Sequence, residues 1–259
     1  MQNHLKVVLI QADLIWEKPK QNRLNFTKKI EEINDDVDLV VLPEMFTSGF
    51  TMNASAVAES MQGETVLWMK DLASKKDIAI TGSLVIADEN SFYNRLLFVE
   101  PSGNITYYNK RHTFTLVGED ETYTAGNEKL IINYKGWKIC PLICYDLRFP
   151  VWARNTEDYD VLIYVANWPK PRVSAWDTLL KARAIENMCY CIGVNRVGVD
   201  GVHSEYSGHS AVYDVLGNVK TSMTPNKEQV ETVTLEKRHV EAYRSKLKFL
   251  NDKDSFAIN

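Results

Sequence analysis

Runs of apolar residues along the chain follow two spacings, and each spacing predicts a different element. Short runs rich in Val, Ile and Leu predict buried strands, as at residues 5–12 and 161–166. Apolar residues that recur every three or four positions predict helices, as at residues 18–34 and 65–76. Helices and strands alternate in the first part of the chain, and strands joined by turns follow. This order predicts a pair of mixed sheets covered by helices.

The same criteria predict the remaining elements, and residues 119–128 are expected to form a loop. Further strands are expected at residues 38–42, 78–81, 84–87, 92–100, 105–109, 129–134, 137–143, 189–196 and 229–235, a hairpin at 209–215 and 218–221, and helices at 148–156, 175–188 and 238–244. We expect a single domain over residues 1–245. A polar C-terminal tail, residues 246–259, follows it and either docks on a neighbour or stays mobile.

A cysteine stands at the end of one of these strands. Cys144 follows the apolar run at residues 137–143 and precedes a turn. A thiol in this position can project from the sheet into a cleft and act as a nucleophile. The alternative is a buried cysteine that packs like a small hydrophobic residue.

Two other predicted strands also end in an ionisable residue. Glu44 follows the strand at residues 38–42 and Pro43, which cannot donate a hydrogen bond to a sheet. Lys110 follows the strand at residues 105–109. Either residue alone is compatible with a solvated surface charge. Because strand ends gather along one rim of a sheet, the three positions together predict a base, a cation and a thiol around one cleft.

These three motifs, in this order, resemble the nitrilase superfamily of carbon–nitrogen hydrolases with its Glu–Lys–Cys triad. The stretches that carry the resemblance are LPEMF, NKRHTF and ICYDLRFP, of which the last is the most specific. The resemblance covers nearly the whole chain. It implies an α/β fold, a four-layer αββα sandwich of two mixed β-sheets flanked by helices, often paired into dimers. It assigns the nucleophile to Cys144, the general base to Glu44 and the catalytic lysine to Lys110.

The resemblance also implies a second active-site glutamate between the lysine and the cysteine. The stretch GEDETYTAG offers Glu119 and Glu121. Glu119 is preferred because it lies seven residues before Gly126, a spacing similar to that in family relatives. Which of the two glutamates points inward stays open.

The residues around the cysteine are similar to those of the omega-amidase branch, which hydrolyses the terminal amide of 2-oxoglutaramate and 2-oxosuccinamate. Tyr145-Asp146-Leu147-Arg148-Phe149 follow Cys144, and Asn167-Trp168-Pro169 end the strand at residues 161–166. The resemblance implies a thioester intermediate and neither a metal nor an organic cofactor. Candidate substrate contacts are Tyr145, Arg148, Phe46, Trp168 and Tyr206. Arg148 and Arg172 are candidates for a substrate carboxylate; the alternative for each is an ion pair at the surface or behind the site.

Three other functions stay open from the sequence: an N-carbamoyl amino acid or amine amidohydrolase, a nitrile hydrolase, and a binding module without catalysis. Net charge and the length of the apolar runs limit the kinds of binding partner that we expect. A net charge of −4 with mixed signs gives no basic surface for nucleic acid, and no apolar run of membrane-spanning length occurs. The expected partners are a small-molecule amide and further copies of the chain, in a homodimer or higher homo-oligomer.

The N-terminus and the cysteines predict a cytoplasmic protein. The first residues lead directly into a strand and lack the features of a signal peptide. The four cysteines are therefore expected to be free thiols in a reducing compartment. Cys140 and Cys144 on one strand would lie about 13 Å apart, which is too far to share a zinc ion.

Overall fold

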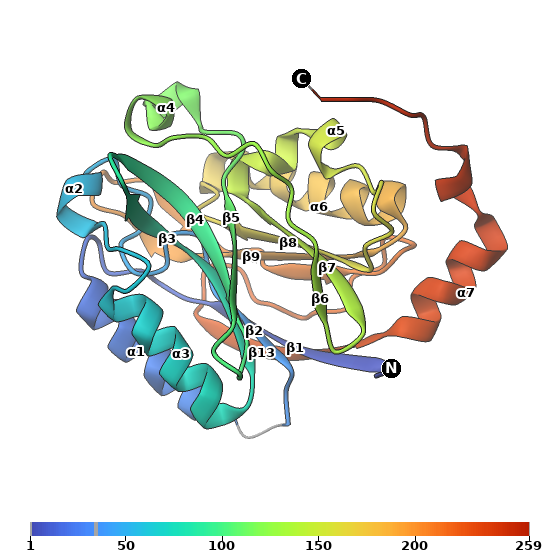
Figure 1. The fold of residues 1–259 in the computed structure, drawn as a ribbon, viewed down its shortest axis with the longest axis horizontal. Helices are drawn as coiled ribbons and strands as arrows, with labels where there is room; N and C mark the ends of the chain where they lie inside the picture. Colours follow the sequence, from blue (N-terminus) through green and yellow to red (C-terminus); the bar gives the residue numbers. More distant parts are fainter. Residues whose placement is uncertain (1, 34–35, 259) are drawn as a thin grey trace.

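The computed structural model of the protein describes residues 2–33 and 36–258 and shows four layers, helix, sheet, sheet and helix (Figure 1). Helices α1 (Pro19–Glu31) and α3 (Glu64–Lys76) cover the outer face of one sheet. Helices α5 (Pro150–Ala153) and α6 (Val173–Asn187) cover the other sheet. The four-layer αββα sandwich of mixed sheets is thus confirmed.

The first sheet has six strands, and alternation along them feeds two separate cores. In spatial order they are β13 (Gln229–Glu236), β1 (His4–Gln11), β2 (Leu39–Val41), β3 (Ala79–Asp88), β4 (Ser91–Val99) and β5 (Ile105–Asn109). Along β1, Val7 and Leu9 pack into the core shared with the second sheet. Val8 and Ile10 point the other way, against α1 and α3, because successive side chains in a strand alternate between faces.

The second sheet has five strands and is buried on both faces. In spatial order they are β12 (Ala211–Tyr213), β9 (Tyr190–Asn195), β8 (Val161–Ala166), β7 (Trp137–Ile143) and β6 (Ile132–Tyr134). Strands β7, β8 and β9 are parallel, and every residue of β8 and β9 is buried, which explains their continuous apolar sequence. Gly193 lets α6 approach, since a Cβ there would lie 2.4 Å from Leu180 Cδ1.

Several predicted elements differ from the structure. The expected loop at residues 119–128 begins with a short helix, α4 (Glu119–Thr122). The expected helix at residues 148–156 is shorter in the structure. Arg148 ends the 3₁₀ turn η2 (Cys144–Arg148), and only α5 is helical within the expected range, with Pro150 at its first position. The hairpin of β10 (Val197–Val199) and β11 (Glu205–Ser207) and the helix α2 (Ala54–Val57) were not predicted from the sequence. The helix expected at residues 18–34 ends at Glu31, and residue 34 lies outside the described residues.

The C-terminal segment begins inside a helix. Helix α7 (Lys237–Leu247) runs past residue 245, and the 3₁₀ turn η4 (Phe249–Asp252) follows it. Beyond this turn, Lys253 donates to the backbone oxygen of Asn155 at 3.4 Å. The division into a domain at residues 1–245 and a tail at 246–259 stays a prediction, and residues 1 and 259 lie outside the described part. Across that part, no helix combines the length and apolar character needed to cross a bilayer.

Candidate active site

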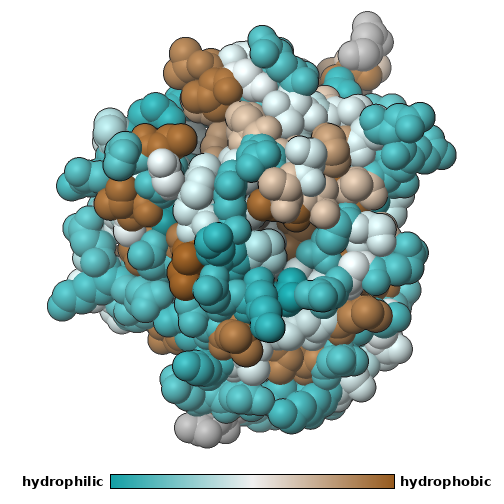
Figure 2. Space-filling model, turned by 90° about the vertical axis from the view of Figure 1, so that its left-hand side faces the viewer, coloured by the Kyte–Doolittle hydropathy of each residue, from teal (hydrophilic) through white to brown (hydrophobic). Residues whose placement is uncertain are grey.

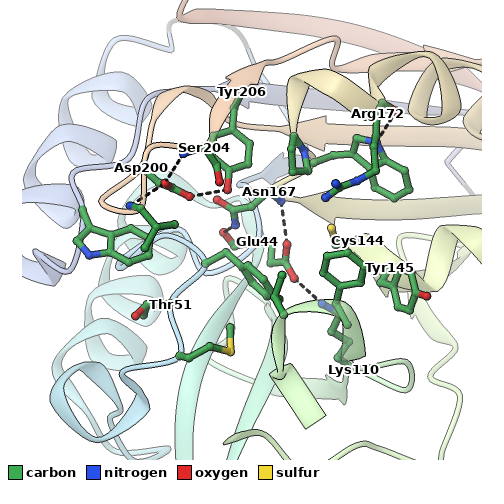
Figure 3. A pocket seen from close by; sticks show the side chains of 18 of the residues that line it. Glu44, Thr51, Lys110, Cys144, Tyr145, Asn167, Arg172, Asp200, Ser204 and Tyr206 are labelled. Atoms are coloured by element: carbon green, nitrogen blue, oxygen red, sulfur yellow. Dashed lines mark hydrogen bonds and ion pairs between the residues drawn. The ribbon is translucent and has the colours of Figure 1, made fainter. Parts of the chain in front are cut away.

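Four strand ends from the two sheets meet at one place (Figure 3). Glu44 follows β2 and Lys110 follows β5 in the first sheet; Cys144 follows β7 and Asn167 follows β8 in the second. Cys144 has φ 41°, a left-handed backbone conformation that residues other than glycine rarely adopt. Such strain persists only where the surroundings hold it, and it clusters at functional sites.

Lys110 forms salt bridges with two buried carboxylates, those of Glu44 and Glu119. Its Nζ lies 2.9 Å from Glu44 Oε1 and 2.9 Å from both carboxylate oxygens of Glu119. The three side chains are 1%, 0% and 0% exposed. Burial alone would lower the pKa of Lys110, but the carboxylates of Glu119 and Glu44 outweigh burial and raise the pKa above its usual value. Lys110 is therefore held in its positively charged form.

Burial raises the pKa of Glu119, and the attraction of Lys110 offsets part of this increase. Glu119 also accepts a hydrogen bond from the backbone N–H of Phe114. The structure thus places Glu119 against Lys110, whereas Glu121 is exposed.

Cys144 carries a thiol whose surroundings disfavour its ionisation. Burial raises the pKa of Cys144 well above its usual value, the nearby Glu44 carboxylate raises it further, and Lys110 acts in the opposite direction. A neutral thiol is a poor nucleophile, so it needs a base that takes its proton as it attacks. Cys144 is 9% exposed at the pocket, whereas Cys140, Cys189 and Cys191 are fully buried. Among the described residues, it is the one cysteine that lines this cavity.

Two asparagines hold Glu44 in place: Asn94, which was not predicted from the sequence as a site residue, and Asn167, which was expected only to end a strand. Asn94 Nδ2 donates to Glu44 Oε1 at 2.8 Å and to Glu119 Oε1 at 3.3 Å. The backbone N–H of Asn167 donates to Glu44 Oε2 at 2.8 Å, and its Nδ2 donates to the Glu44 backbone oxygen at 2.6 Å. Both carboxylate oxygens of Glu44 are thereby oriented. The one sequence signal for Asn167 was its place after β8.

These groups open onto a cavity of about 510 Å³. It is lined by Trp16, Glu17, Glu44, Phe50, Thr51, Met52, Asn53, Lys110, Phe114, Val117, Cys144, Tyr145, Arg148, Asn167, Trp168, Pro169, Arg172, Asp200, Val202, Ser204 and Tyr206. Figure 2 looks onto the side of the molecule that carries α2 and α4, where apolar side chains lie in a hollow framed by hydrophilic ones. Of the sequence-predicted contacts, Tyr145, Arg148, Trp168, Tyr206 and Arg172 all line the cavity.

Phe46 is the exception among the expected contacts, because the structure places it outside the cavity wall. It is fully buried on the helix-covered side of the first sheet, with its ring 5.4 Å from Phe26 and 5.8 Å from Trp68. The preceding residue, Met45, has φ 41°, and this turn directs Phe46 away from the pocket. The interpretation of Phe46 as a substrate contact is therefore corrected to a core residue.

Two arginines face the cavity without a carboxylate partner within the described ranges, 2–33 and 36–258. The Arg172 guanidinium lies 5.3 Å from the centre of the Phe114 ring, and that of Arg148 lies 4.8 Å from the Trp168 ring. Arg172 is half-buried and Arg148 is exposed. Arginine binds carboxylates through two parallel hydrogen bonds, so both groups are suited to an anionic ligand.

Tyr145 supplies a backbone donor beside the sulfur. Cys144 begins the 3₁₀ turn η2, and the first N–H groups of a helical turn have no acceptor within the turn. The Tyr145 N–H and Lys110 Nζ are therefore candidate hydrogen-bond donors for an oxygen held next to Cys144. In the described part of the chain, no group of three or more His, Cys, Asp or Glu side chains is arranged to hold a metal ion.

Known proteins resemble this chain in both sequence and fold. The chain matches the carbon–nitrogen hydrolase family over residues 6–245. It is 41% identical over 254 residues to the omega-amidase YafV of Yersinia enterocolitica, covering 98% of each chain. It is 35% identical to the 2-oxoglutaramate amidase of Bacillus subtilis, over 81% of this chain and 83% of that one. XC1258 from Xanthomonas campestris, a CN-hydrolase superfamily protein with an arsenic adduct in its active site, superposes with a TM-score of 0.97 at 43% identity, covering 100% of both chains.

The chain therefore belongs to the carbon–nitrogen hydrolase family, and the nitrilase superfamily predicted from its motifs is confirmed. Within this family it lies in the omega-amidase-like branch and is a hydrolase that acts on amides.

Proposed function

We propose that this protein is a cysteine-dependent amidohydrolase for small 2-oxo dicarboxylic acid monoamides. Its substrates are 2-oxoglutaramate and 2-oxosuccinamate, whose terminal amide it converts to the acid and ammonia. The observation that carries this proposal is a buried Glu44–Lys110 pair, with N–O distance 2.9 Å, in a cavity that Cys144, Arg148 and Arg172 also line. The names of the two relatives support the substrate class.

The first half of the reaction acylates the enzyme. Glu44 takes the Cys144 proton as the sulfur attacks the amide carbon, so a C–S bond forms and the carbonyl electron pair moves onto oxygen. Lys110 Nζ and the Tyr145 N–H stabilise the resulting oxyanion. Glu44 then passes its proton to the nitrogen as the C–N bond breaks. Ammonia leaves, and the acyl group remains on Cys144 as a thioester.

The second half returns the enzyme to its starting state. Glu44 takes a proton from water as the water oxygen attacks the thioester carbon. The C–S bond breaks, the acid leaves, and the proton on Glu44 returns to the sulfur. Glu44 is better placed than Glu119 for this step, because Glu44 lines the cavity and Glu119 lies behind Lys110. Glu119 orients Lys110 and thereby acts through it as a positioning residue.

The free carboxylate of the substrate binds at the arginine side of the cavity. Figure 3 shows Arg172 on the same side of the pocket as Cys144 and across from Asp200. Its partial burial weakens competition from water, so a bidentate carboxylate contact there stabilises the complex more than a contact at the exposed Arg148. The proposed pocket therefore selects amides that carry an anionic end.

A substrate panel tests the proposed function. We expect ammonia release from 2-oxoglutaramate and 2-oxosuccinamate with kcat/KM well above that for glutamine, N-carbamoyl amino acids or aliphatic nitriles. The measurement is a coupled ammonia assay, with carbon dioxide followed in parallel, since carbamoyl substrates release both gases. A preference for carbamoyl compounds would contradict the proposed substrate class, although the fold would still be that of the family.

The variant Arg172→Gln is expected to raise KM for 2-oxoglutaramate by about 10- to 100-fold, the cost of losing a hydrogen bond to a charged group. Its kcat should change little, because the lost contact is present in ground state and transition state alike. Steady-state kinetics with 2-oxoglutaramate and with neutral butanamide measure the effect. The matched variant Arg148→Gln is expected to change KM less. An equal loss on butanamide would contradict a carboxylate contact at Arg172.

We infer a cytoplasmic location and a homodimer or higher homo-oligomer. Four free cysteines, all buried, are consistent with a reducing compartment. Val151 and Ile185 on the outer helices are 55% and 44% exposed, which supports pairing of copies through that layer. Sedimentation of the purified protein measures the assembly, and a monomer at high concentration would exclude it.

A further inference from the structure

One buried carboxylate next to the nucleophile takes no direct part in the proposed chemistry. Asp146 is fully buried, lies outside the cavity lining, and accepts four hydrogen bonds. Its Oδ2 accepts from Tyr108 Oη at 2.8 Å and from the Ile143 backbone N–H at 3.0 Å. Its Oδ1 lies 3.0 Å from the backbone nitrogen of His112 and 2.8 Å from His112 Nδ1. Burying a carboxylate is costly unless donors surround it, and here they do.

These donors come from the two segments that carry the reacting groups. Ile143 and Asp146 lie on either side of Cys144 at the end of β7, in the second sheet. Tyr108 and His112 lie two residues before and two residues after Lys110, at the end of β5 in the first sheet. Asp146 therefore connects two segments through hydrogen bonds: the turn after β7, which carries Cys144, and the end of β5, which carries Lys110.

Further contacts hold the hydrogen-bond partners of Asp146 in place. Tyr108 Oη also accepts from the Arg111 backbone N–H and from Trp152 Nε1, both at 3.0 Å. The His112 ring stacks on Phe149, with ring centres 3.6 Å apart and an interplanar angle of 3°. Tyr108 and His112, two of the partners of Asp146, are thus each held by a second contact. The left-handed conformation of Cys144 needs support of this kind.

We propose that Asp146 is a positioning residue that fixes the spacing between the Cys144 sulfur and Lys110 Nζ. The inference rests on the proposed function, in which those two atoms act on the same carbonyl group. A shift of one sheet edge against the other would leave the pocket open and the substrate bound. It would also move the oxyanion donor away from the carbon that the sulfur attacks. Asp146 therefore affects kcat and not KM.

The variant Asp146→Asn tests this role. An amide group keeps one acceptor oxygen and replaces the other with a donor, so two of the four contacts are lost. We expect kcat for 2-oxoglutaramate to fall about 100-fold, the effect of a displacement of about 1 Å in a reacting group, while KM stays close to that of the wild type. Steady-state kinetics and thermal unfolding are measured on the same purified protein.

Asp160 provides the matched control. It is also a buried aspartate, and it accepts from the Lys138 backbone N–H at 2.9 Å and contacts Lys237 and Arg244. It precedes β8, at the sheet edge opposite Cys144. Asp160→Asn should lower the melting temperature and leave kcat unchanged. An equal loss of kcat in the Asp160 variant, or an unchanged kcat in Asp146→Asn, would overturn the proposal.

If Asp146→Asn does not fold, the variant Tyr108→Phe tests the positioning role of Asp146 in its place. It removes one donor to Asp146 and leaves the Arg111 N–H without its acceptor, so kcat should fall at constant KM; an unchanged kcat would again overturn the positioning role. Cys144→Ala separates this outcome from failure of the proposed function. If Cys144→Ala keeps its activity, the proposed chemistry fails. If it is inactive while both positioning variants are fully active, the role of Asp146 alone fails.

Discussion

Replacing Cys144 with alanine is expected to lower kcat for amide hydrolysis by at least about 10⁴-fold, as removal of the nucleophile does in other hydrolases. The reason is that neither Glu44 nor Lys110 can form the covalent intermediate. Ammonia release at saturating 2-oxoglutaramate measures the loss. Thermal unfolding of the same sample checks that the fold is intact.

Cys140→Ala is the control for this variant. Cys140 lies on the same strand, β7, but is fully buried away from the cavity, and burial raises the pKa of its thiol to about 12. Its replacement should leave kcat unchanged. Full activity in Cys144→Ala would rule out the thioester route.

Replacing Lys110 with methionine is expected to affect both activity and stability. The change removes an oxyanion donor, which costs about 100- to 1,000-fold in kcat. It also leaves the Glu44 and Glu119 carboxylates buried without their cation, and breaking a buried ion pair in this way destabilises a protein by about 3–5 kcal/mol. Kinetics and denaturant unfolding measure the two effects.

The stability loss in Lys110→Met should depend on pH. Burial already raises the pKa of Glu119 in the wild type, and removing the cation raises it further. A carboxyl group whose pKa is raised by folding contributes stability at low pH and loses it as pH rises through the folded-state pKa. The variant should therefore be less stable near about pH 8 than near about pH 5, relative to the wild type.

Lys75→Met is the control for the lysine variant. Lys75 forms an exposed pair with Glu31 at 3.0 Å, and such pairs contribute about 0–1 kcal/mol. Its removal should change neither kcat nor the pH dependence of stability. If Lys110→Met matched the wild type at every pH, the buried salt bridges would not exist as described.

Much of the site could be predicted because strand ends are visible in a sequence. Glu44, Lys110 and Cys144 each follow a predicted strand. β2 and β5 end at the same edge of the first sheet, and β7 of the second sheet ends at the same cavity. The choice of Glu119 over Glu121 rested on spacing alone, and the structure places Glu119 against Lys110. The layers of the fold followed from the order of helices and strands.

The groups that orient the site could not be predicted, since they depend on how one sheet lies against the other. Asn94 lies inside β4 and Asn167 follows β8, yet both bond to Glu44. Nothing in the local pattern fixes that register. The prediction for Phe46 was wrong because the backbone turns at Met45, with φ 41°, and the Phe46 ring packs against Phe26 and Trp68. The short segments α2, α4 and η2 are too brief for a helical period to show.

The mass of the intact protein, acid-quenched during turnover of 2-oxoglutaramate, tests the central claim most directly. We expect an added mass equal to the substrate less ammonia, located by digestion on the peptide that contains Cys144, and no added mass on Cys144→Ala. An acyl group on any other residue, or turnover by Cys144→Ala, would contradict it.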